Sequence, residues 1–196
     1  RGSKGGTLGN RSGAWQLPGS VRDRQSVTAD WQRVDAGLIE GVALFEMKNV
    51  LGSHGHLTEI YRADWKLDDA GVEQVFQTVF EPGGVSAWHA HELTRDRLFV
   101  AVGTMSIVLY DGREDSPSFG RINEFRLGSL RPGIVSVPPR VWHGVECLSK
   151  ESAVLLNLVD RAYCYDRPDH FRLPPDSDRI PYRWSSAAGA GSSRGA

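Results

Sequence analysis

The chain has 196 residues, a formal net charge of −1 and 40% hydrophobic residues, so it can bury the core of one ordinary domain. The near-neutral charge excludes the basic surface of a nucleic-acid-binding protein, and no apolar run approaches the ~20 residues that a membrane-spanning helix needs. The two cysteines do not make a disulfide framework, so we expect the reducing environment of the cytoplasm.

The two ends of the chain lack any hydrophobic period. Residues 1–24 are rich in Gly, Ser and Arg, and we interpret them as a flexible N-terminal tail. Residues 185–196 contain almost only Ser, Ala and Gly, which predicts a disordered low-complexity tail. A single folded domain is therefore expected over residues 25–184.

Short apolar runs recur along this domain, and turn signals such as Asp111-Gly112 and Arg131-Pro132-Gly133 separate them. No segment shows a long period of 3.6 residues, so helix should be scarce. The pattern predicts an all-β fold, either an antiparallel sandwich or a barrel. In chain order the expected strands cover residues 42–45, 57–61, 72–80, 98–102, 105–110, 123–127, 134–137, 145–148 and 153–159.

A strand with two histidines stands out between Gly83 and Gly103. His89 and His91 are two residues apart, so on a strand both imidazoles point to the same face. Asp96 follows just before an apolar run, and a further histidine, His143, lies in a proline-rich segment. If the pair faces the inside of a barrel, a hairpin brings the carboxylate close and another strand brings the third imidazole.

This set of side chains fits two kinds of chemistry. Imidazoles and a carboxylate are usual ligands of a divalent metal ion. They are equally the acid–base groups of an enzyme that moves protons. In either case buried imidazoles need partners, because an unpaired buried polar group costs about 1–3 kcal/mol.

The histidine spacing resembles the two motifs of the cupins. Gly83-x5-His89-x-His91-x4-Asp96-x6-Gly103 is similar to the first motif, with Asp in place of the usual Glu. Gly133-x4-Pro138-x4-His143 is similar to the second. The resemblance implies a double-stranded β-helix, or jelly-roll barrel. For a metal-binding member it implies Fe, Mn, Zn or Ni on four ligands, which would be His89, His91, Asp96 and His143.

A closer resemblance, over about residues 50–184, is to the dTDP-4-dehydrorhamnose 3,5-epimerases. Residues 111–120 are similar to their segment Asp-x-Arg-x-x-Ser-Pro-Thr-x-Gly, and residues 137–144 to Ile-Pro-Pro-Gly-x-x-His-Gly. Residues 84–89 and 55–59 are similar to two further family segments. The resemblance implies an epimerase that acts on a 4-keto nucleotide sugar without a cofactor, commonly as a homodimer.

The resemblance also assigns roles to residues. His89 would be the base that removes a proton beside the sugar ketone, which suits an imidazole with a pKa near 6.5. His143 would bind or polarise the sugar. For the epimerase hypothesis we also expect Asp96 or Tyr163 to hold or return the proton. The residues expected to bind substrate are His91, Arg97, Glu59 and Tyr163.

Three family features have no counterpart at the matching places. The lysine that stabilises the enolate is replaced by Asp96, the catalytic tyrosine falls near Leu156 or Asn157, and the aspartate that partners the base would lie beyond Trp184. Three interpretations therefore stay open: a sugar epimerase, a metal-dependent cupin enzyme (isomerase, lyase or oxygenase), and a sugar-binding cupin without catalysis.

Overall fold

The computed structural model describes residues 15–30, 34 and 37–185, and the chain divides into two compact units, residues 1–36 and 37–196. In the first unit the backbone N–H of Val34 donates to the carbonyl of Ser26 (3.0 Å). Most of the two expected tails, residues 1–14 and 186–196, lies outside the described residues. The second unit begins at Gly37, later than the expected residue 25, and the bounds of the folded domain stay a prediction.

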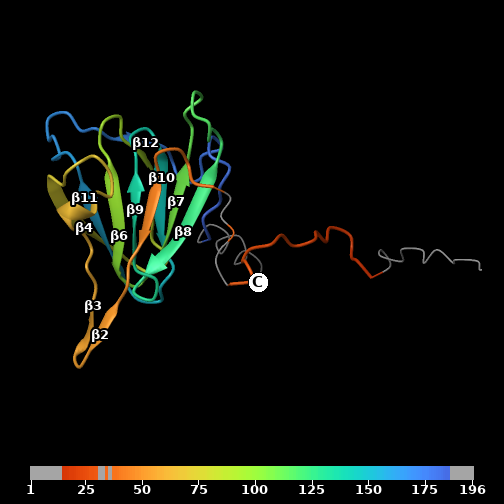
Figure 1. The fold of residues 1–196 in the computed structure, drawn as a ribbon. Helices are drawn as coiled ribbons and strands as arrows, with labels where there is room; N and C mark the ends of the chain where they lie inside the picture. Colours follow the sequence, from red (N-terminus) through yellow and green to blue (C-terminus); the bar gives the residue numbers. More distant parts are fainter. Residues whose placement is uncertain (1–14, 31–33, 35–36, 186–196) are drawn as a thin grey trace, which may run out of the picture. The chain divides into compact units, whose positions relative to one another are not determined.

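Two five-stranded antiparallel sheets form the second unit (Figure 1). The first sheet has the order β1-β9-β6-β11-β4, with β1 (Ala43–Glu46), β9 (Gly133–Val137), β6 (Asp96–Val102), β11 (Ala153–Val159) and β4 (Gln74–Phe80). The second has the order β12-β5-β10-β7-β8, with β12 (Phe171–Arg172), β5 (Val85–Ala90), β10 (Trp142–Cys147), β7 (Thr104–Tyr110) and β8 (Ile122–Gly128).

Little else is regular in the described residues. The strands β2 (Val50–Gly52) and β3 (Gly55–Leu57) form a hairpin that projects away from the two sheets in Figure 1. A single 3-10 turn, η1, covers Ala63–Trp65. No helix among the described residues is long and apolar enough to cross a membrane. The predicted all-β class with little helix is confirmed.

The main hydrophobic core lies between the two sheets. The first sheet contributes Leu98 and Val100 of β6, and the second contributes Ile107 and Leu109 of β7. Successive side chains of a strand alternate between faces, so the even-numbered residues of β6 point into the core. Asp96, at the start of β6, shares that parity and is 2% exposed. The fold thus turns this carboxylate towards the inside of the barrel.

The outer face of the second sheet is covered by the C-terminal segment. Trp88 of β5 packs there with Ile180 and Trp184, and all three are buried. This confirms that Trp88 points to the opposite face of β5 from the histidines. Gly144 of β10 permits the close approach, because a Cβ there would lie 2.5 Å from Ala87 Cβ and 2.8 Å from the Trp184 ring.

One expected strand is wrong. Residues 57–61 were expected to be extended, but β3 ends at Leu57 and residues 58–61 belong to no strand. Ile60 and Tyr61 are apolar because they pack against a third core cluster, which contains Phe99 and Ile134 on the outer face of the first sheet. The apolar residues of this segment are therefore explained by packing against the core cluster, and not by pairing in a strand.

Candidate functional site

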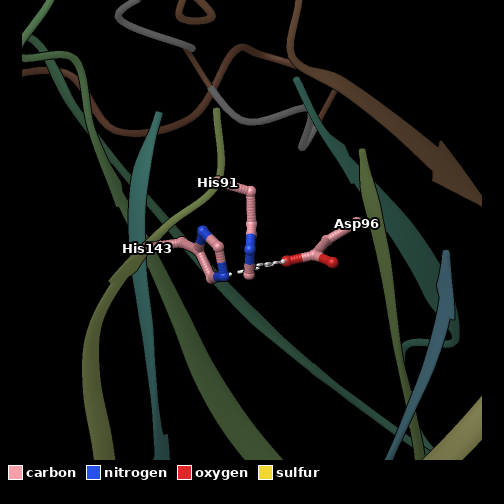
Figure 2. A group of neighbouring side chains, drawn as sticks. All are labelled: His91, Asp96 and His143. Atoms are coloured by element: carbon pink, nitrogen blue, oxygen red, sulfur yellow. Dashed lines mark ion pairs between the residues drawn. The ribbon is translucent and has the colours of Figure 1, made fainter. Parts of the chain in front are cut away.

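Three side chains from the two sheets meet inside the barrel (Figure 2). Asp96 begins β6 in the first sheet, His143 lies on β10 in the second, and His91 directly follows β5. Asp96 Oδ2 is 3.1 Å from His91 Nε2 and 3.0 Å from His143 Nε2. The other carboxylate oxygen accepts a hydrogen bond from Asn157 Nδ2 (3.0 Å). One buried carboxylate thus organises two imidazoles.

The far side of each imidazole is fixed by a backbone carbonyl. His91 Nδ1 is 2.5 Å from the carbonyl oxygen of Asp169, and His143 Nδ1 is 3.2 Å from that of Val141. A carbonyl only accepts, so each Nδ1 carries a proton, and each Nε2 faces Asp96. Such outer partners set the orientation and tautomer of a histidine in an active site.

The Asp96 carboxylate and the His91 ring shift each other's pKa values. Burial alone would raise the pKa of Asp96, but His143 and His91 hold it well below its usual range. Burial alone would lower the pKa of His91, but the hydrogen bond and charge of Asp96 outweigh that effect, and the pKa is raised. An imidazolium–carboxylate pair, His91 with Asp96, is therefore favoured at this position.

His89 lies next to this cluster but outside it. Its ring centroid is 5.9 Å from that of His143, and the two residues are partners across β5 and β10. Its Nδ1 accepts a hydrogen bond from Arg172 Nη1 (3.0 Å), and its Nε2 contacts Ser86 Oγ (2.9 Å). Burial, followed by the charges of His143 and Arg172, lowers the pKa of His89 to about 4.

The expected four-residue metal set is therefore corrected to three. Among the described residues, His91, Asp96 and His143 could hold a divalent ion, since their ligand atoms all lie within 4.8 Å of one another. His89 is not part of this group, and its ring nitrogens contact Ser86 and Arg172.

A cavity of about 770 Å³ opens onto the cluster. His91, Asp96 and Asn157 form its inner wall, and the segment between β11 and β12 forms the outer one. Tyr163, an expected substrate-binding residue, lines the cavity and packs edge-on against Tyr165 with ring centroids 5.2 Å apart. The cavity has the size of a small-molecule site.

Two expected substrate-binding residues lie elsewhere. Arg97 occupies the odd parity of β6, is 0% exposed, and donates from Nε to Asp68 Oδ2 (2.8 Å). It belongs to a buried ion pair outside the cavity, which corrects its assignment. Glu59 is exposed, pairs with Arg62 (3.4 Å), and lines a separate apolar groove beside Trp65.

The sequence analysis missed two residues of the cavity, Asp169 and His170. The Asp169 carboxylate accepts hydrogen bonds from the backbone N–H groups of residues 92–94. The His170 ring lies 4.6 Å from the His91 ring, and burial, with the charges of His91 and Arg172, lowers its pKa. One signal was available: aromatic and imidazole side chains concentrate in an otherwise polar segment.

A jelly roll of two antiparallel sheets with an imidazole–carboxylate cluster inside it defines a cupin-type barrel. The chain belongs to the dTDP-4-dehydrorhamnose 3,5-epimerase family, whose model matches residues 37–194. The predicted family resemblance and cupin fold are confirmed, and the chain is an enzyme of the nucleotide-sugar epimerase class. The alternative of a metal-dependent cupin enzyme is not favoured by these matches.

Several relatives match most of the chain. It is 34% identical over 149 residues to a probable low-salt glycan biosynthesis epimerase of Haloferax volcanii (76% of this chain, 96% of that protein). It is 28% identical over 149 residues to a spore coat polysaccharide biosynthesis protein of Bacillus subtilis (76% and 98%). A dTDP sugar isomerase of Desulfovibrio desulfuricans superposes with a TM-score of 0.70 at 29% identity (74% and 92%).

A more distant solved structure has the same fold. The dTDP-6-deoxy-D-glucose-3,5-epimerase of Legionella pneumophila, in complex with dTDP-4-keto-L-rhamnose, superposes with a TM-score of 0.68 at 18% identity. The match covers 76% of this chain and 81% of that one.

Proposed function

We propose that the protein epimerises a 4-keto nucleotide sugar. The sugar binds in the cavity whose outer wall is the chain segment between β11 and β12. The observation that carries the proposal is that one cavity holds a buried imidazole–carboxylate pair, His91 with Asp96, and a phenol, Tyr163. Removal and return of a proton beside a ketone needs acid–base side chains of these types and no cofactor. The matched relatives and the family support the same reaction class.

The cluster replaces the lysine that the family resemblance expects at Asp96. Loss of the proton leaves negative charge on the ketone oxygen, and this enolate needs positive charge or hydrogen-bond donors nearby. The raised pKa of His91 favours the imidazolium, which lies against the cavity. His91 then supplies the positive charge, while Asp96 and the Asp169 carbonyl keep the ring in place.

The same cavity offers cations for the nucleotide diphosphate. Arg161 and Arg167 both line it. A guanidinium group can donate two parallel hydrogen bonds to the oxygens of one phosphate, and it keeps its positive charge at any physiological pH. We assign the pyrophosphate to these two arginines and the sugar to the inner wall formed by His91 and Asn157.

We further propose that the protein is a homodimer in which a second copy covers strand β4. This strand is at the edge of the first sheet, and Val75, Phe76 and Val79 on it are exposed. An exposed apolar edge strand has unpaired backbone groups that pair readily with another chain. A second copy of the chain would satisfy these groups and bury the apolar side chains.

Solvent exchange tests the proposed reaction. We expect the wild-type protein, incubated with dTDP-4-keto-6-deoxyglucose in D2O, to introduce deuterium at the carbons beside the ketone, as seen by NMR. A chelator such as EDTA should leave the rate unchanged, because the acid–base groups are side chains. Binding of dTDP without any exchange of 4-keto nucleotide sugars would contradict an epimerase and leave a sugar-binding cupin.

A further inference from the structure

The Asp169 side chain binds the turn that directly follows His91. Its carboxylate accepts hydrogen bonds from the backbone N–H groups of Glu92 (2.8 Å), Leu93 (3.0 Å) and Thr94 (2.9 Å), and from the Thr94 hydroxyl (2.9 Å). Hydrogen bonds to an ionised acceptor are stronger than those between neutral groups. These four contacts therefore join the C-terminal segment firmly to the turn beyond β5.

The backbone of the same residue binds His91 itself. The Asp169 carbonyl oxygen is 2.5 Å from His91 Nδ1, and on the other side of the ring His91 Nε2 is 3.1 Å from Asp96 Oδ2. The position of the carbonyl depends on the anchoring of its own residue, and the carboxylate of Asp169 is the nearest anchor along the chain. The carboxylate thus acts on the direction of the His91 ring through the carbonyl of the same residue.

The segment has other anchors, but they lie further from the Asp169 carbonyl. Near its start, the N–H of Ala162 donates to Glu73 Oε2 (3.1 Å) and the N–H of Tyr163 donates to Gln74 Oε1 (2.8 Å). Near its end, β12 pairs with β5 over two residues only. Loss of the carboxylate should therefore release the chain around residue 169, while the start of the segment stays attached to β4.

We propose that Asp169 is a positioning residue, whose carboxylate holds the His91 ring in the direction that stabilises the enolate. The inference rests on the proposed function, in which His91 supplies the positive charge beside the ketone oxygen. All four contacts of the carboxylate are to the turn, so Asp169 acts on the reaction through His91. A charged group that is already in place needs no reorganisation when the enolate forms, so its position affects the rate directly.

The test compares Asp169→Ala and Asp169→Asn with Asp166→Ala and Asp166→Asn. Asp166 is the matched control, because it is an exposed aspartate on the same segment. NMR follows the deuterium exchange of dTDP-4-keto-6-deoxyglucose, and calorimetry measures dTDP affinity. The 1H NMR signal of the His91 Nδ1–H reports the short hydrogen bond to the Asp169 carbonyl, and its absence from His91→Asn assigns it.

We expect Asp169→Ala to lower the exchange rate at least about tenfold, because a displacement of about 1 Å in an active site can cost about 100-fold. The His91 N–H signal should shift or disappear. The affinity for dTDP should stay close to the wild-type value, because Ala162 keeps the chain beside Arg161 attached. Asp169→Asn should lose less, since its amide keeps one accepting oxygen, and both Asp166 variants should match the wild type.

Two results would overturn the inference alone, and Asp169→Asn decides if Asp169→Ala does not fold. Wild-type exchange by the variant would show that the carboxylate does not position a group that the reaction uses. A loss of exchange with the His91 N–H signal intact would make Asp169 a structural anchor of the cavity wall. Absence of exchange by the wild-type protein would instead overturn the proposed function, and the inference with it.

Discussion

At the scale of single residues, the site depends on one carboxylate whose two oxygens have different partners. Asp96 Oδ2 faces His91 and His143, and Oδ1 accepts from Asn157. The family resemblance expects a lysine at this position, so the chain has exchanged one positive side chain for a carboxylate between two imidazoles. At the inner wall of the cavity the positive charge then belongs to His91, whose pKa is raised mainly by the Asp96 carboxylate.

The substitution Asp96→Asn tests this dependence. Without the negative charge the pKa of His91 should fall, so the ring becomes neutral at neutral pH and the enolate loses its stabilising cation. We expect the exchange rate to fall at least about tenfold, with a loss of about 1–3 kcal/mol in the free energy of unfolding from the broken buried contacts. NMR titration of the His91 ring would check the cause. An unchanged pKa of His91 would refute this explanation.

At the scale of elements, one of the segments that resemble the family, residues 111–120, is a structural loop. Asp111 lies between β7 and β8, and its carboxylate accepts hydrogen bonds from Arg113 Nε (2.8 Å), Ser116 Oγ (2.6 Å) and Ser118 Oγ (2.6 Å). The Asp-x-Arg-x-x-Ser-Pro pattern is therefore explained by these bonds, and none of its residues lines the cavity. Sequence similarity in this segment is therefore evidence for a shared fold, and not for a shared reaction.

The Asp111 loop predicts an acid-dependent stability. Burial alone would raise the pKa of Asp111, but Arg113 and the two serine hydroxyls hold it well below its usual range. A lowered folded-state pKa stabilises the fold above the unfolded pKa, about 3.9, and this contribution is lost as the pH falls through the folded-state value. Asp111→Asn should therefore lower Tm most at pH 7 and less at pH 3, where part of the contribution is already lost, as measured by calorimetry. An equal effect at both pH values would contradict this account.

At the scale of the whole molecule, strand β4 leaves one sheet with an open apolar edge. Val79→Lys places a charge on that edge, which is a usual way in which proteins prevent strands from pairing between chains. We expect light scattering to give twice the chain mass for the wild type and a single chain mass for Val79→Lys. The matched control, Leu130→Lys on an exposed loop, should stay dimeric. A wild-type monomer would exclude the proposed interface.

The parity of residues along a strand is a property of the sequence, and it predicted much of the site. It placed His89 and His91 opposite Trp88, whereas the approach of Asp96 was expected from a hairpin. Applied once more, it would have placed Arg97 on the outer face, where Asp68 binds it. Sequence order and alternation thus predicted the all-β class and the shared face of His89 and His91.

The tertiary structure decided how the histidines are used. Asp169 and His170 reach the cluster from a segment almost eighty residues further along the chain than His91, and no local pattern encodes that approach. In the same fold the ring nitrogens of His89 contact Arg172 and Ser86. His89 and His91 are only two residues apart, but their side chains have different partners. Strand periodicity fixes only the face on which a side chain lies, whereas its partners depend on the register and packing of distant segments.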